Sequence, residues 1–94
     1  MFKISTDANG TIHLVGKMHD AHSKTVLETL QNVTESCTVD FSELVYISSS
    51  GLGLLLQAQK KLEASGHGLT LTGMSDHVRE LFAITRFDIL FDIK

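Results

Sequence analysis

Three consecutive serines, Ser48 to Ser50, are the residues of this chain whose position could carry chemistry. They follow a β-branched and aromatic run and precede a leucine-rich run, which indicates the passage from a buried strand into a helix. A serine there can cap the helix by accepting a hydrogen bond from a backbone N–H, which contributes about 1 kcal/mol. The same position lies at the positive end of the helix dipole and also suits a phosphate. A cap and a phosphorylation switch are therefore the two interpretations of this cluster.

Two glycines, Gly51 and Gly53, stand in the first turn of the same predicted helix. Each costs about 1 kcal/mol in a helix relative to alanine, so each needs a reason. Either the turn packs closely against a neighbouring strand, or another protein approaches it closely. The hydroxyl cluster just before them favours an interaction surface.

Catalysis by these serines lacks the usual accompanying residues. A nucleophile elbow needs a glycine two residues before the serine, where this chain has Tyr46 or Ile47. No Gly-Lys-Ser/Thr follows to make a phosphate-binding loop. Asp40 and Glu43 do not form a recognisable catalytic pair, and Asp40 is expected to bond to backbone at a strand end. We expect no enzyme, with an esterase as the weakest alternative.

Metal binding is not expected either. His19 and His22 could share a helix face, but a metal site needs three or four ligands and nothing completes this pair. The single cysteine, Cys37, precedes Val39 at strand spacing, which favours a buried, inert thiol in a reducing compartment. We therefore expect no metal and no cofactor.

Charge and length restrict the remaining possibilities. The 94 residues suit one domain, residues 1–94, and the net charge of −3 is scattered rather than gathered in blocks. No basic stripe is present to bind nucleic acid. No apolar run, Leu54 to Leu56 included, approaches the roughly 18 to 20 residues of a membrane span. The N-terminus lacks the organisation of a signal peptide, so we expect a cytoplasmic protein with no membrane insertion.

Apolar periodicity predicts an α/β domain with a small mixed central sheet of about four to five strands and three or more helices. The expected strands are Phe2–Thr6, Thr11–Val15 (ending at Gly16), Cys37–Phe41 with a continuation over Leu44–Ile47, and Leu69–Thr72. The expected helices are Ala21–Val33 behind an Asp20 cap, Ser50–Ala64 with Gln59 facing outward, and one behind a Ser75 cap. The strand containing Val39 to Phe41 should be central, and the crossovers right-handed.

The order of these pieces resembles the STAS family, the sulfate-transporter and anti-sigma-factor-antagonist domain. In that family a strand reading apolar-Asp-apolar-Ser leads into Asp-Ser-Ser-Gly-Leu-Gly at the start of the next helix. The matching segments here are Val39-Asp40-Phe41-Ser42 and Ser48-Ser49-Ser50-Gly51-Leu52-Gly53. Further matches are Leu71 to Ser75 with Val78, and Leu81 to Phe91. The resemblance covers nearly the whole chain and implies a STAS-like fold.

Stand-alone STAS proteins are usually partner-switching regulators in signal transduction and transcription, and they are not enzymes. They bind a serine kinase that is also an anti-sigma factor, or a related regulator, and phosphorylation after the motif aspartate breaks the complex. Carried over by position, the resemblance implies Ser49 as the phosphoacceptor. The implied partner-binding residues are Gly16, His19 and Asp20 in the first turn and Ser48, Ser49, Ser50, Gly51, Leu52 and Gly53 in the second.

Two departures from the family pattern lie at this site. Ser48 replaces the motif aspartate, and His19 stands where a Gly-x-Leu-Asp turn would place its acid, with Asp20 one position later. Both remove negative charge near Ser49. The first slightly favours the alternative implied by the resemblance, a cytoplasmic accessory subunit that docks on the ATPase of an ABC-type lipid transporter. The oligomeric state stays open at this point.

Overall fold

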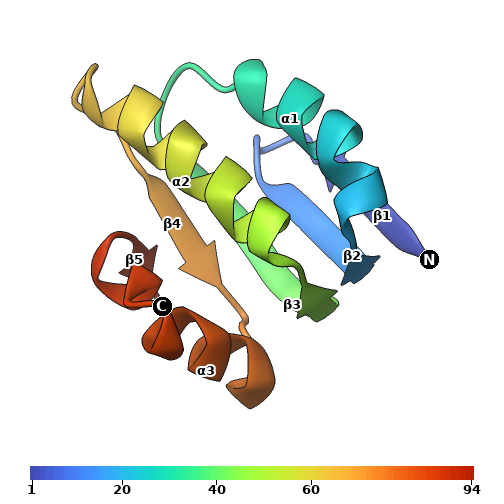
Figure 1. The fold of residues 1–94 in the computed structure, drawn as a ribbon. Coiled ribbons are helices and arrows are strands. Elements are labelled where there is room, and N and C mark those ends of the chain that lie inside the picture. Colours follow the sequence, from blue (N-terminus) through green and yellow to red (C-terminus); the bar gives the residue numbers. More distant parts are fainter.

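The strands form one mixed sheet in the order β1-β2-β3-β4-β5, in a computed structural model that describes residues 1–94 (Figure 1). The strands are β1 Phe2–Thr6, β2 Ile12–Met18, β3 Cys37–Ile47, β4 Leu69–Thr72 and β5 Asp92–Ile93. The α-helices are α1 Ser23–Gln31, α2 Ser49–Glu63 and α3 Asp76–Ile84, with short 3-10 turns η1 Asp20–His22 and η2 Phe87–Ile89. The predicted α/β class and the central position of β3 are confirmed.

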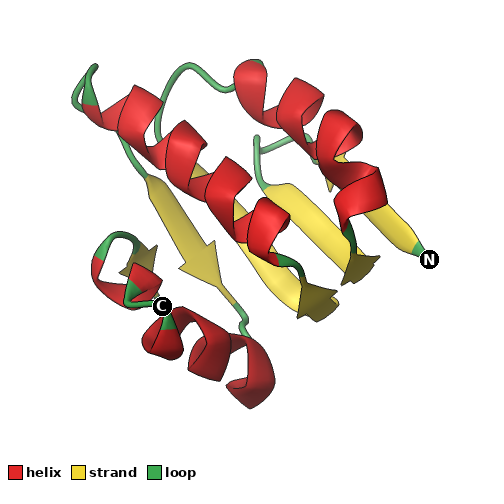
Figure 2. Ribbon diagram, in the orientation of Figure 1, coloured by secondary structure: helices red, strands yellow, loops and turns green.

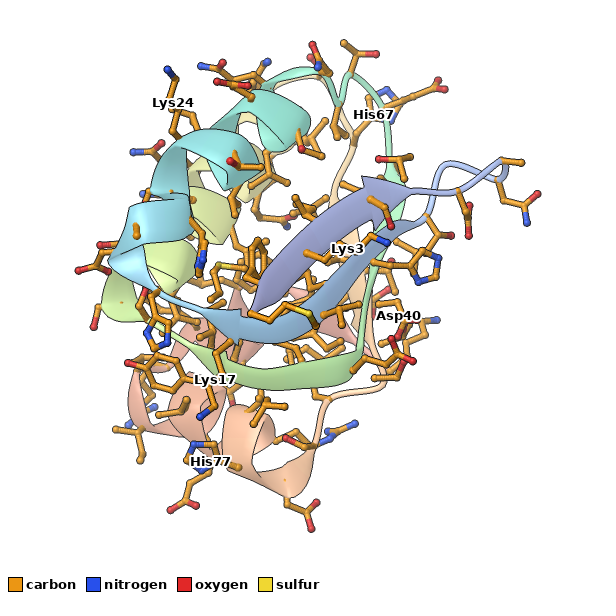
Figure 3. The ribbon with its side chains drawn as sticks, turned by 90° about the vertical axis from the view of Figure 1, so that its right-hand side faces the viewer. Lys3, Lys17, Lys24, Asp40, His67 and His77 are labelled. Carbon is orange, nitrogen blue, oxygen red and sulfur yellow. The ribbon has the colours of Figure 1, made fainter.

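All helices cover one face of this sheet. β1 pairs antiparallel with β2, whereas β2–β3, β3–β4 and β4–β5 are parallel. Right-handed crossovers between successive parallel neighbours place every connecting helix on the same face. Figure 3 shows α1 and α2 on one side of the sheet, with Lys3 and Asp40 on the other. The structure is therefore a two-layer sandwich with one sheet face open to solvent.

The core lies between the sheet and the helices. Val39 and Phe41 of β3 are fully buried, as strand alternation requires when one face is covered. The ring of Phe82 on α3 packs edge-on against Phe41 and Phe91, at centroid distances of 5.9 and 5.8 Å. Ser75 caps α3 by accepting from Val78 N at 3.2 Å, as the sequence predicts.

The predicted interruption of β3 at Ser42 and Glu43 is a bulge within one continuous strand. The pairs His13–Asp40 and Val15–Glu43 are separated by two residues on β2 and by three on β3. A second extra residue lies between the pairs of Gly16 and Lys17. Bulges of this kind re-aim side chains, and here they bury Leu44 and leave Glu43 and Val45 exposed, the reverse of regular alternation from Val39 and Phe41.

The prediction that the second strand ends at Gly16 is wrong. β2 continues to Met18, because Gly16 adopts a φ of 91° that lets its backbone lie against Met1. A Cβ at Gly16 would lie 2.1 Å from the Met1 carbonyl oxygen, so only glycine fits there.

The first helix is also shorter than the predicted Ala21–Val33. It begins at Ser23, after the 3-10 turn η1, and ends at Gln31. Asp20 is not its cap: His19 is the residue before η1, and its backbone N–H donates to His22 Nδ1 at 3.0 Å. Neither η1 nor α1 therefore has the side-chain N-cap bond that the sequence assigns to Asp20.

Gln59 faces inward, contrary to the prediction. Its Oε1 accepts from the backbone N–H of Leu69 at 2.7 Å, and its Nε2 donates to the carbonyl of Leu90 at 3.1 Å. One amide therefore joins α2 to the start of β4 and to the C-terminal segment. Helical periodicity did not predict the burial of Gln59, because the sequence does not distinguish a glutamine buried on the apolar face from one exposed to solvent.

Replacing Gln59 by leucine should destabilise the fold by about 1 to 3 kcal/mol, because the buried N–H of Leu69 loses its acceptor. Gln57→Leu, at an exposed position two residues earlier, is the matched control and should change stability by less than about 0.5 kcal/mol. Urea denaturation measures both. Equal effects of the two changes would contradict the bridging role of Gln59.

Candidate functional site

The predicted site lies at the edge where β2 and β3 both end. Parallel strands bring their carboxyl ends to one edge, and the helices that follow begin there (Figure 2). Met18 pairs with Ile47, and the Ser48 N–H donates to the Met18 carbonyl at 3.0 Å. The first turn of α2 and the segment of η1 are thus neighbours, although they are separated in sequence by β3 and α1.

The three serines differ in what they do. Ser48 is 7% exposed and caps α2, since its Oγ accepts from the Gly51 N–H at 3.2 Å. Ser49 and Ser50 are exposed at the first two helical positions. The helix cap is therefore Ser48, whereas the hydroxyls accessible to another protein are those of Ser49 and Ser50.

The surroundings of Ser49 suit a negative charge. Helix N-termini carry unpaired N–H groups and the positive end of the helix dipole. The first turn of α2 has no acidic residue that would repel a phosphate. Ser48, where the family has aspartate, leaves this turn without the carboxylate that would stand next to Ser49.

The two glycines in the first turn of α2 have different structural explanations. A Cβ on Gly51 would lie 2.5 Å from Met18 Sδ and 2.8 Å from Ile47 Cγ1, so this glycine lets α2 pack directly on the strand ends. A Cβ on Gly53 would meet nothing within 4 Å. Gly53 follows Ser49 by four residues and shares its side of the helix. Packing within the chain explains Gly51 and leaves Gly53 unexplained.

A groove of about 720 Å³ lies beside this edge, and sequence reasoning missed most of its residues. Its lining includes Lys17, Tyr46 and His77, with the ring of His19 tilted against that of Tyr46 at a centroid distance of 5.3 Å. Figure 3 shows Lys17 and His77 at the same end of the molecule. The bulges of β3 expose Glu43 and Val45, which also line this groove, and the positions of the bulges depend on the strand register, which the sequence does not give.

Of the residues that the STAS resemblance implies as partner-binding, some are exposed and others are buried. Those accessible are His19, Asp20, Ser49 and Ser50, with Gly53 partly exposed. Ser48, Gly51 and Leu52 are buried, and Gly16 lies within β2. The structure therefore brings the two predicted turns together and limits the accessible surface to part of each.

Few other side chains are placed to bind a metal or to react. No three histidine, cysteine, aspartate or glutamate side chains gather in a way that could hold a metal ion. Cys37 is partly buried, and this burial raises the pKa of its thiol. None of the helices has the length and apolar character needed to cross a bilayer.

Comparison with known proteins identifies the family. A family model described as "Mlab, STAS domain" matches residues 2–92. The chain belongs to the STAS family. A curated relative, the anti-sigma-B factor antagonist of Listeria monocytogenes, is 38% identical over 56 residues, which are 60% of this chain and 49% of that protein. The match thus spans about half the length of the curated relative. The corresponding protein of Listeria innocua matches equally.

Solved structures share the fold of this STAS domain. The anti-sigma factor antagonist SpoIIAA in its unphosphorylated form is 21% identical, with a TM-score of 0.68 over 88% of this chain and 82% of that one. The Bacillus cell fate determinant SpoIIAA in its phosphorylated form is 19% identical, with a TM-score of 0.71 over 100% and 91%. At these identities the likeness establishes the fold.

Ser48→Ala should destabilise the protein by about 1 kcal/mol, the usual effect of losing a helix cap. Ser48→Asp should retain most of this stability, because aspartate accepts the same N–H and favours the dipole. Ser49→Ala is the control and should leave the denaturation midpoint nearly unchanged. Thermal and urea denaturation test this, and an unchanged midpoint for Ser48→Ala would contradict the cap.

Proposed function

We propose that this STAS domain is a non-enzymatic switch of the anti-sigma factor antagonist kind, controlled by phosphorylation of Ser49. The observation that carries the proposal is that Ser48 and Ser49 differ in burial and in hydrogen bonding. Ser48 supplies the cap from a buried position, so the exposed Ser49 is free to be modified without loss of the helix. The partner would be a serine kinase that is also an anti-sigma factor, or a related regulator.

The physical effect of the phosphate would be on the surface rather than on the fold. A phosphoserine adds a charge of about −1.5 to −2, which a helix N-terminus tolerates. The same charge in an interface with an acidic or apolar partner is poorly tolerated. The structures of SpoIIAA in its unphosphorylated form and in its phosphorylated form both align with this chain at similar TM-scores, which supports a switch that keeps its fold.

Gly53 supports the same surface. A glycine at this position lowers the stability of the helix relative to alanine, and no close packing within the chain explains why a side chain is absent there. A partner that approaches α2 closely next to Ser49 would explain the glycine, because contacts with the partner would offset the lost helix stability. The exposed His19 follows Met18, whose carbonyl accepts from the Ser48 N–H, and its ring packs against Tyr46 of the groove, so this turn lies between the start of α2 and the groove.

A second candidate is the accessory subunit of an ABC-type lipid transporter, which would use the same helix face on a transporter ATPase. The specific observation in its favour is Ser48, because the family's aspartate beside the phosphoacceptor is missing. Neighbouring genes discriminate cheaply: a kinase and a sigma factor favour the switch, whereas a permease and an ATPase favour the transporter.

Ser49→Asp should weaken binding of the kinase-type regulator, because a carboxylate imitates part of the phosphate charge. Ser49→Ala should preserve binding, and Ser50→Asp serves as a comparison for a neighbouring exposed charge. Isothermal titration with the purified regulator gives the three affinities. Equal affinities for Ser49→Asp and Ser49→Ala would remove Ser49 from the mechanism.

Gly53→Ala should stabilise the free protein by up to about 1 kcal/mol and still weaken partner binding, because the added methyl occupies the space that the partner needs. Gly51→Ala should instead destabilise by about 1 to 3 kcal/mol, because its methyl overlaps Met18 and Ile47. Denaturation and titration are measured on the same samples. Unchanged partner affinity in a stabilised Gly53→Ala protein would exclude close approach at Gly53.

A further inference from the structure

A histidine held between two carboxylates lies at the other end of the sheet from Ser49. His13 Nε2 is 2.8 Å from Asp7 Oδ2, and His13 Nδ1 is 3.0 Å from Asp40 Oδ2. These residues come from three places: the turn after β1, β2 itself and β3. The cluster faces the open side of the sheet, where Figure 3 shows Asp40.

Each carboxylate uses its other oxygen to organise backbone. Asp7 Oδ1 accepts from the N–H groups of Asn9 and Thr11, at 2.8 and 3.1 Å, and so shapes the hairpin turn. Asp40 Oδ1 accepts from the N–H of Ser42 at 2.9 Å, at the bulge of β3. Through His13, the turn of residues 7–11 is therefore joined to the central strand.

The geometry specifies the protonation state of the imidazole. Both ring nitrogens face carboxylate oxygens, which only accept, so both nitrogens must carry a proton. A neutral ring has one N–H and would turn a lone pair toward the second carboxylate. The clasp is thus complete only when His13 is charged.

We propose that His13 is a protonation-dependent clasp: while charged it holds the hairpin turn of residues 7–11 against β3, and when neutral it releases the turn. The turn covers part of Cys37, whose Sγ donates to the Gly10 carbonyl at 3.3 Å. Turn residues also form one wall of a polar hollow of about 500 Å³. Release of the turn exposes the thiol and opens this hollow.

The charged groups around His13 favour its protonated form. Acidic side chains reach it from the turn (Asp7) and from β3 (Asp40), and Glu43 lines the same hollow. β1 contributes one base, Lys3, to that hollow, and β4 contributes the uncharged Thr72 opposite Asp40. Acids therefore outnumber bases around the ring.

The pKa values agree in direction with this geometry. The hydrogen bond to Asp7, with that to Asp40, raises the pKa of His13 above its ordinary 6.5. The pKa of Asp7 is lowered, mainly by His13, and that of Asp40 mainly by the Ser42 N–H. The His13 contribution is thus complete below pH 6.5 and is lost as pH rises through its raised pKa. The carboxylate contributions are present above pH 3.8 and are lost as pH falls through their lowered pKa values.

Alkylation of Cys37 by iodoacetamide tests the proposal, because this is the only cysteine in the chain. The rate is measured from pH 5.5 to 9 for the wild type and His13→Gln, and the ratio of the two rates removes the common dependence on thiolate. The variant should react severalfold faster at pH 6, and the ratio should fall toward one as wild-type His13 loses its proton. His77→Gln, a histidine change at the opposite end of the molecule, should give a ratio near one throughout.

A ratio for His13→Gln that does not change with pH, whatever its value, would overturn the proposal. A second measurement needs no variant: nitrogen-15 NMR of the wild-type imidazoles should show both His13 nitrogens protonated at pH 6. The hairpin amides should become more mobile in the same pH range in which His13 titrates. A neutral His13 at pH 6, or hairpin mobility independent of its titration, would equally overturn it.

Discussion

The packing of the first turn of α2 onto the ends of β2 and β3 is the contact on which the rest of the site depends. Gly51 allows this contact, because any side chain there would overlap Met18 and Ile47. The close approach buries Ser48 as a cap and turns Ser49 and Ser50 outward. It also brings η1 beside α2, since Ser48 bonds to the last residue of β2. One glycine thus decides which hydroxyls a partner can reach.

The two ends of the sheet have different chemistry because the strands are parallel. The carboxyl end gathers helix N-termini, whose unpaired N–H groups suit phosphate. The amino end holds the hairpin turn, whose Asn9 and Thr11 N–H groups already donate to Asp7, and the turn is held through the charged clasp of His13. Since all helices cover one face, the clasp lies on the open face where solvent pH reaches it. The proposed phosphorylation site and the proposed pH-sensitive clasp are thereby separated in space.

Periodicity and capping rules predicted the parts of the fold that depend on local sequence. The central β3, the cap of α3 at Ser75 and most of α2 belong to this class, whereas the role of Ser49 as phosphoacceptor rests on the STAS resemblance and stays a prediction. Features that depend on register between strands could not be predicted. The exposure of Val45, the strand position of Gly16 and the meeting of Asp7, His13 and Asp40 all follow from pairings that join distant residues. The inward Gln59 was missed because its partners lie on β4 and the C-terminal segment.

Mass spectrometry of the tagged protein and its co-purifying partners from native cells, including the peptide that contains Ser48 to Ser50, tests the proposed switch most directly. If Ser49 is the switch, a serine kinase or related regulator is expected in the bound pool, with unmodified Ser49 there and phosphate on Ser49 in the unbound pool. A transporter ATPase as the bound partner, with the serine peptide unmodified in both pools, would contradict it and favour the accessory-subunit alternative.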